Sequence, residues 1–175
     1  MKKRILVVED HRDTLEVLEY ELEFLGYETL VATNGFEAVE LAGSENPDLI
    51  IMDMMLPKLN GLEATFQIRS NPKTQFIPIL AATAKAMPGD REVFLKAGCA
   101  GYIAKPFSHV ELGQAIEKIL CKIESHFLLY MRPYSEQPVA RESVGAATRR
   151  SFVCMIRAHF RNRLHCLVGS KLRCL

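Results

Sequence analysis

Five polar residues end or directly follow short apolar runs of this sequence. Their side chains combine carboxylates, a hydroxyl and an ammonium group, and they are Glu9, Asp10, Asp53, Thr83 and Lys105. Carboxylate oxygens are the ligands that hard cations such as Mg²⁺ prefer, while an ammonium and a hydroxyl can bind the oxygens of a phosphoryl group. The combination predicts metal-assisted phosphoryl transfer, provided that the fold brings the five residues together.

Each of these residues has an ordinary structural explanation when taken alone. A single Asp at the end of a strand more often caps a helix or forms a turn, and a lysine before a proline is usually a solvated loop residue. His11, beside the acidic pair, is interpreted as an exposed residue at the start of a helix. The functional hypothesis therefore depends on all five positions meeting at one edge of a sheet.

Five apolar runs, at residues 5–8, 29–32, 48–53, 77–82 and 101–104, predict buried strands. Helical patterns follow each of them, near residues 12–25, 35–43, 61–70, 87–97 and from 109 onward. Asn34 and Ser108 are predicted helix caps, Pro88 fits the first turn of its helix, and Gly26, Gly43 and Gly98 are predicted helix ends. The middle of the run at 48–53 has apolar side chains on both faces, which predicts a central strand.

The alternation of strands and helices predicts an α/β fold, with a doubly wound five-stranded parallel sheet and helices on both faces. In such sheets ligands bind beyond the carboxyl ends of the strands. The five polar residues all fall at strand ends of this kind, so the predicted fold gathers them.

The motifs that surround these residues resemble the receiver domain of CheY-like response regulators in two-component signalling, of the single-domain, DivK-like kind. The resemblance rests on Glu9-Asp10, on the run from Asp53 to Pro57 that leads to Gly61, on Thr83 between two alanines, and on the segment from Tyr102 to Lys105-Pro106. It covers about residues 2 to 123 and implies a flavodoxin-like strand order of 2-1-3-4-5.

The resemblance also implies roles for the site residues. Asp53 accepts a phosphoryl group from a histidine kinase or a histidine phosphotransfer protein. Mg²⁺ is the implied cofactor, held by Asp10, Asp53 and the backbone carbonyl of Met55, with Glu9 acting mainly through a metal-bound water. The protein would then be a switch that catalyses only its own phosphorylation and dephosphorylation, and not an enzyme for a separate substrate.

Three further residues complete the implied switch. Lys105 and the Thr83 hydroxyl bind the phosphoryl oxygens, and Thr83 and Tyr102 move when Asp53 is phosphorylated. Their movement remodels the surface of the fourth helix, fifth strand and fifth helix for a downstream protein target. A phosphorylation-dependent dimer is a further expectation.

The charge of the chain divides near residue 120. Residues 1–120 carry 12 Lys and Arg against 18 Asp and Glu, whereas residues 121–175 carry 10 against 3. We expect a receiver domain at 1–123, a linker at 124–147 and a basic tail at 148–175, in which a possible amphipathic helix surrounds apolar residues with arginines. No run of about 18 apolar residues occurs, and a cytoplasmic location is expected.

Three hypotheses for the tail stay open: contact with nucleic acid or an anionic membrane, docking on a partner or on the chain itself, and an extension without a role. Its Cys154, His159, His165 and Cys166 match no usual zinc spacing. Two rivals concern the whole chain. One is a DNA-binding regulator whose tail is the effector, although only one candidate helix is visible there. The other is a small phosphatase that uses Asp53 as a transient nucleophile.

Overall fold

The computed structural model describes residues 2–84 and 90–131, with side chains described as far as Lys122. Within these ranges five strands alternate with five helices. The strands are β1 (Arg4–Val8), β2 (Glu28–Ala32), β3 (Leu49–Asp53), β4 (Ile79–Thr83) and β5 (Gly101–Ala104). The helices are α1 (Arg12–Phe24), α2 (Gly35–Glu45), α3 (Gly61–Ser70), α4 (Asp90–Lys96) and α5 (His109–Met131).

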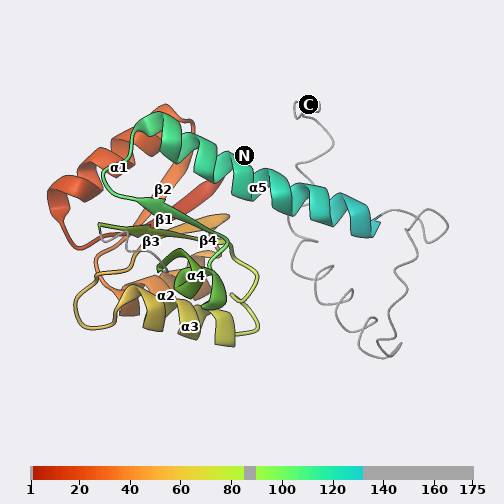
Figure 1. The fold of residues 1–175 in the computed structure, drawn as a ribbon, viewed down its shortest axis with the longest axis horizontal. Coiled ribbons are helices and arrows are strands. Elements are labelled where there is room, and N and C mark those ends of the chain that lie inside the picture. Colours follow the sequence, from red (N-terminus) through yellow and green to blue (C-terminus); the bar gives the residue numbers. More distant parts are fainter. Residues whose placement is uncertain (1, 85–89, 132–175) are drawn as a thin grey trace. The chain divides into compact units, whose positions relative to one another are not determined.

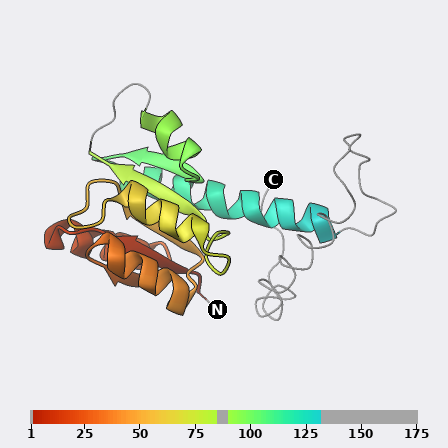
Figure 2. The same cartoon turned by 90° about the horizontal axis from the view of Figure 1, so that it is seen from below.

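The strands form one parallel sheet in the order β2-β1-β3-β4-β5. Helices α1 and the first turns of α5 cover one face, and α2, α3 and α4 cover the other (Figures 1 and 2). This confirms the predicted fold class and strand order. Every residue of β3 is buried, as expected of a central strand that is covered on both faces.

The core follows from the alternation of side chains along each strand. Leu6 and Ile50, from neighbouring strands, lie in one cluster with Ala38 of α2 and with Ala64 and Ile68 of α3. The small alanines let these two helices approach the sheet closely.

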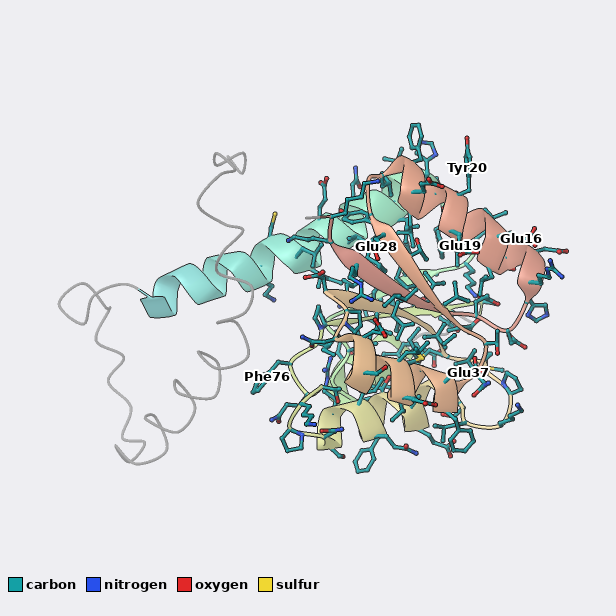
Figure 3. All side chains as sticks on the ribbon, turned by 180° about the vertical axis from the view of Figure 1, so that it is seen from behind. Glu16, Glu19, Tyr20, Glu28, Glu37 and Phe76 are labelled. Atoms are coloured by element: carbon teal, nitrogen blue, oxygen red, sulfur yellow. The ribbon has the colours of Figure 1, made fainter. Side chains whose placement is uncertain are left out.

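Helix α1 is amphipathic and packs on the sheet through one face. Its Leu15, Leu18 and Leu22 are buried, while Glu16 and Tyr20 project outward from the helix (Figure 3). An apolar stripe on one side and charged residues on the other are typical of a helix that packs on a sheet.

Several predicted helix ends are confirmed. The Asn34 side chain accepts hydrogen bonds from the backbone N–H groups of Phe36 and Glu37, and the Ser108 hydroxyl accepts one from Glu111. Gly26 and Gly98 follow α1 and α4 with φ of +87° and +99°, values that favour glycine.

The predicted bounds of two elements, α2 and β4, were wrong. Helix α2 does not stop at Gly43; it continues to Glu45 and ends at Asn46, whose φ of 47° supplies the left-handed residue instead. Strand β4 begins at Ile79, because Pro78 has no N–H to donate, and it includes Thr83, which was expected to follow it.

Helix α4 is described from Asp90 to Lys96, and residues 87–89 of the helix predicted at 87–97, Pro88 among them, lie outside the described residues. Helix α5 continues through Met131, so residues 124–131, expected to be linker, are helical. The rest of the linker and the tail at 148–175 lie outside the described residues. No helix in the described part of the chain is both long and apolar enough to cross a membrane.

Candidate functional site

The carboxyl edge of the sheet gathers four of the predicted residues. Glu9 directly follows β1, Asp53 ends β3, Thr83 ends β4, and Lys105 directly follows β5. The backbone N–H of Lys105 donates to the carbonyl oxygen of Thr83 at 2.8 Å, which continues the pairing of the last two strands. Because these strands are consecutive neighbours in a parallel sheet, their ends meet at one edge, where α/β proteins bind ligands.

Lys105 joins the two buried acids of the site. Its ammonium donates to Glu9 Oε2, and also to Asp53 Oδ2 at 2.5 Å. Glu9 is only 2% exposed and Asp53 8%. Charged groups this deeply buried need partners of opposite charge, and one ammonium here serves two carboxylates.

Two opposing effects act on the pKa of Lys105. Burial alone would lower the pKa, because it disfavours the charged ammonium. The hydrogen bonds and negative charges of Asp53 and Glu9 outweigh burial, and the pKa is raised above the ordinary lysine value. Lys105 therefore supplies a fixed positive charge beside Asp53.

The two oxygens of Asp53 have different partners. Oδ2 contacts Lys105, while Oδ1 accepts a hydrogen bond from the backbone N–H of Met55 at 2.8 Å. Met55 is 57% exposed, and its contact with Asp53 is made by its backbone. These two contacts hold the Asp53 carboxylate in one orientation.

A second group of ligand atoms lies at the end of β1. Atoms of Glu9, Asp10 and His11 that can bind a metal lie within 4.8 Å of one another. Glu9 is buried, whereas Asp10 and His11 are exposed, so the group opens to solvent on one side. Carboxylates of this kind suit a divalent cation.

Gly61, the first residue of α3, lets this helix start against the end of β3. A Cβ atom at Gly61 would lie 2.2 Å from the carbonyl oxygen of Asp53 and 2.8 Å from Met54 Cα. The N-cap of α3 is Asn60, which forms a capping box with Glu63. The motif around Gly61 does not by itself predict this close approach to Asp53.

The predicted switch residues lie on β4 and β5. Thr83 is 2% exposed. Tyr102 is half-buried and stacks on Phe94 of α4, with ring centroids 5.9 Å apart and an interplanar angle of 20°. Tyr102 thus links β5 to α4.

Arg69 of α3 is a second residue that sequence reasoning missed. It donates to the carbonyl oxygens of Gly98, Gln75 and Ile77 at 2.9, 2.7 and 2.7 Å. Burial lowers the pKa of its guanidinium. Arg69 joins the ends of α3 and α4 to the start of β4, but no motif in the sequence marks an arginine that binds only backbone carbonyls.

Comparison with known proteins decides the family. The model of the response regulator receiver domain matches residues 5–117. The chain belongs to the response regulator receiver domain family. A curated relative, the polar-differentiation response regulator DivK of Brucella anthropi, is 39% identical over 120 residues, which are 69% of this chain and 98% of the relative. The chain thus contains a receiver domain of two-component signalling, similar to DivK.

Solved receiver domains share the fold. One is the receiver domain of the sensor histidine kinase PA1611 from Pseudomonas aeruginosa, with a magnesium ion coordinated in its active-site cleft. It is 39% identical, has a TM-score of 0.65 and covers 69% of this chain and 99% of its own. Another is the chemotaxis protein CheY4 of Vibrio cholerae, which is 28% identical, has a TM-score of 0.65 and covers 69% of this chain and 100% of its own.

Proposed function

We propose that the protein is a phosphorylation switch in which Asp53 is the phosphoacceptor. A carboxylate oxygen of Asp53 forms a bond to the phosphorus of a phosphohistidine, and the phosphorus–nitrogen bond breaks with its electron pair left on the imidazole nitrogen. The observation that carries this proposal is the contact of Lys105 with both Glu9 and Asp53. The ammonium of Lys105 thereby contacts Asp53, 52 positions away in the chain, and Glu9, 96 positions away.

The donor atoms at this edge fit Mg²⁺. Glu9, Asp10 and Asp53 provide carboxylates, and Met55, whose N–H already donates to Asp53, provides a backbone carbonyl close by in the chain. Mg²⁺ needs only one or two protein carboxylates and keeps several waters, which agrees with an acidic pair that is partly exposed. Bound Mg²⁺ would neutralise charge on the phosphoryl oxygens. The magnesium in the cleft of the Pseudomonas receiver domain supports this assignment.

Lys105 and Thr83 are proposed to bind the phosphoryl group on Asp53. The Lys105 ammonium already contacts Asp53 Oδ2 and can exchange that partner for a phosphoryl oxygen without leaving the site. Thr83 ends the strand next to β3 and can donate its hydroxyl to a second oxygen.

The proposed output is a change in the surface of α4, β5 and α5. Tyr102 is the residue through which Thr83 would affect this surface, because it lies on β5 and stacks on Phe94 of α4. A downstream protein would bind one state of that surface, and a phosphorylation-dependent dimer would use it as well. The phosphoryl donor is a histidine kinase or a histidine phosphotransfer protein, as the family implies.

The protein is proposed to catalyse only its own phosphorylation and dephosphorylation. The rival phosphatase would need turnover of a free phosphoester. The rival DNA-binding regulator depends on residues 148–175, and the described residues give it no support. A single acyl phosphate per chain without turnover favours the switch over the phosphatase, and absence of DNA binding at low salt would remove the DNA-binding regulator.

The proposal is tested by incubating the full chain with acetyl phosphate and Mg²⁺ and measuring its intact mass. We expect one phosphoryl group per chain, which does not form when EDTA is present from the start and does not form in Asp53→Asn. Asp13→Asn, at an exposed acid in the first turn of α1, is the matched control and should be phosphorylated normally. Phosphorylation of Asp53→Asn equal to that of the control would refute the proposal.

A further inference from the structure

Three methionines surround Asp53 in the run from Met52 to Met55. Met52 is 0% exposed and Met54 is 5% exposed, whereas Met55 is 57% exposed. Of the methionines whose side chains the structure describes, Met55 is thus the one that solvent reaches. The chain therefore carries an accessible thioether just beyond its proposed phosphoacceptor.

Core packing does not explain a methionine at position 55. Methionine usually fills irregular gaps in cores, and Met52 and Met54 do so, because both belong to the buried apolar cluster. Leu56 and Leu59, which follow Met55 in the chain, belong to the same cluster. Met55 lies between these buried residues in the sequence but is exposed and is not part of the cluster. What its side chain contributes is the chemistry of a thioether in contact with water.

The backbone of Met55 is in direct contact with the proposed phosphoacceptor. Its N–H donates to Asp53 Oδ1 at 2.8 Å. The side chain of methionine is short and unbranched, so the sulfur stays within one side-chain length of this contact in every rotamer. A change in the polarity of the sulfur therefore occurs close to Asp53 and in contact with solvent.

We infer that Met55 is a modification site at which hydrogen peroxide oxidises the thioether to a sulfoxide, and that the sulfoxide shortens the lifetime of the phosphoryl group on Asp53. The inference rests on the proposed function, because it requires Asp53 to carry that group. In the oxidation, a sulfur lone pair forms a bond to one peroxide oxygen while the oxygen–oxygen bond breaks. The departing hydroxide takes the proton of the transferred oxygen and becomes water, so sulfur is oxidised and peroxide is reduced.

The sulfoxide replaces an apolar group near Asp53 with a strong hydrogen-bond acceptor. Its oxygen binds water, which the thioether holds only weakly. The phosphoryl group is lost by hydrolysis, in which a water oxygen bonds to phosphorus as the bond from phosphorus to Asp53 breaks. The electron pair of that bond returns to the carboxylate, and a proton of the water passes to phosphate or solvent. Water held close to the phosphorus speeds this step through proximity.

The first measurement determines which methionine reacts. The full chain is treated with dilute hydrogen peroxide and digested, and fragment mass spectra locate the added oxygen among Met52, Met54 and Met55. Met55 should be oxidised at least about tenfold faster than the other two, because susceptibility follows exposure. Equal oxidation of the three would overturn the inference.

The second measurement compares phosphoryl lifetimes in the wild type and in Met55→Leu, which has no thioether at this position. Each protein is oxidised or left untreated, freed of peroxide, phosphorylated with acetyl phosphate and Mg²⁺, and followed by intact mass after the donor is removed. Oxidation should shorten the lifetime at least about threefold in the wild type and by less than about 1.5-fold in Met55→Leu. Each protein is compared with its own untreated sample, so any effect of leucine itself cancels.

Met54→Leu is the matched control, because Met54 is the buried neighbour of Met55. It should respond to peroxide like the wild type, and oxidation elsewhere in the chain affects all three proteins alike. Methionine sulfoxide reductase should restore the wild-type lifetime. An equal loss of lifetime in the wild type and in Met55→Leu would overturn the inference, as would an unchanged lifetime in fully oxidised wild type. Failure of untreated wild type to take up a phosphoryl group would instead refute the proposed function.

Discussion

Lys105 Nζ and Asp53 Oδ2 lie 2.5 Å apart at the carboxyl edge of the sheet, although 52 residues separate them in the chain. The same ammonium contacts Glu9. Lys105 thus supplies the positive charge that two buried carboxylates share. Several properties of the protein should follow from this one contact.

Removing the charge of Lys105 should strengthen Mg²⁺ binding while weakening phosphorylation. In Lys105→Met the carboxylates of Glu9 and Asp53 lose their positively charged partner, so their attraction for Mg²⁺ increases. We expect Mg²⁺ affinity to rise at least about fivefold, in line with a charge interaction of about 1 kcal/mol or more. Phosphorylation by acetyl phosphate should fall at least about tenfold, because the phosphoryl oxygens lose a positive partner. Weaker Mg²⁺ binding in the variant would show that Lys105 helps to assemble the metal site instead.

The raised pKa of Lys105 predicts a loss of stability in alkali. A folded-state pKa above the unfolded value contributes stability that is fully present below the unfolded lysine pKa of about 10.4 and is lost as pH rises through the folded value. Urea unfolding in EDTA should therefore show a steeper alkaline fall for the wild type than for Lys105→Met. Parallel curves would mean that the ion pairs of Lys105 do not stabilise the fold.

Gly61→Ala should damage both the fold and the site. The added Cβ would meet the Asp53 carbonyl at 2.2 Å, so the backbone must move, and we expect the free energy of unfolding to fall by about 2–4 kcal/mol. Phosphorylation should fall as well, because the end of β3 carries Asp53. Urea unfolding and intact mass measure the two effects.

Gly43→Ala is the control for that substitution. Gly43 lies inside α2, and a Cβ there has no atom within 4 Å. Alanine should raise the free energy of unfolding by about 0.5–1 kcal/mol, because glycine is a poor helix former. Equal effects at Gly43 and Gly61 would contradict the close approach of α3 to Asp53.

Arg69→Met should destabilise the protein by about 2–4 kcal/mol, because three carbonyl oxygens lose their donor in a partly buried region. Arg91→Met, at an exposed arginine of α4, should change the free energy of unfolding by less than about 0.5 kcal/mol. Similar values for the two variants in urea unfolding would show that the hydrogen bonds of Arg69 contribute little.

The sheet could be predicted from the sequence because its strands are apolar runs with clear ends. The fully buried β3 and the Asn34 cap are examples in which local residue type decides the structure. Local pattern was misleading at Gly43, because a glycine permits a helix end without requiring one, and Asn46 three residues later takes the left-handed conformation.

The candidate site was predictable as a set of residues but not as a set of contacts. Strand ends in a parallel sheet bring Asp53 and Lys105 to one edge, which sequence reasoning can foresee. Lys105 also binds Glu9, and His11 lies beside Asp10. These two contacts depend on side-chain orientation, which the spacing of residues in the sequence does not reveal.

The most direct test of the central claim is to locate the phosphoryl group. The full chain is phosphorylated with acetyl phosphate and Mg²⁺, treated with borohydride, which reduces an acyl phosphate of aspartate to homoserine, and digested for peptide mass spectrometry. The account predicts homoserine at position 53 and at no other acid. Homoserine at Asp10, or none at position 53 in a chain that carries the phosphoryl group, would contradict it.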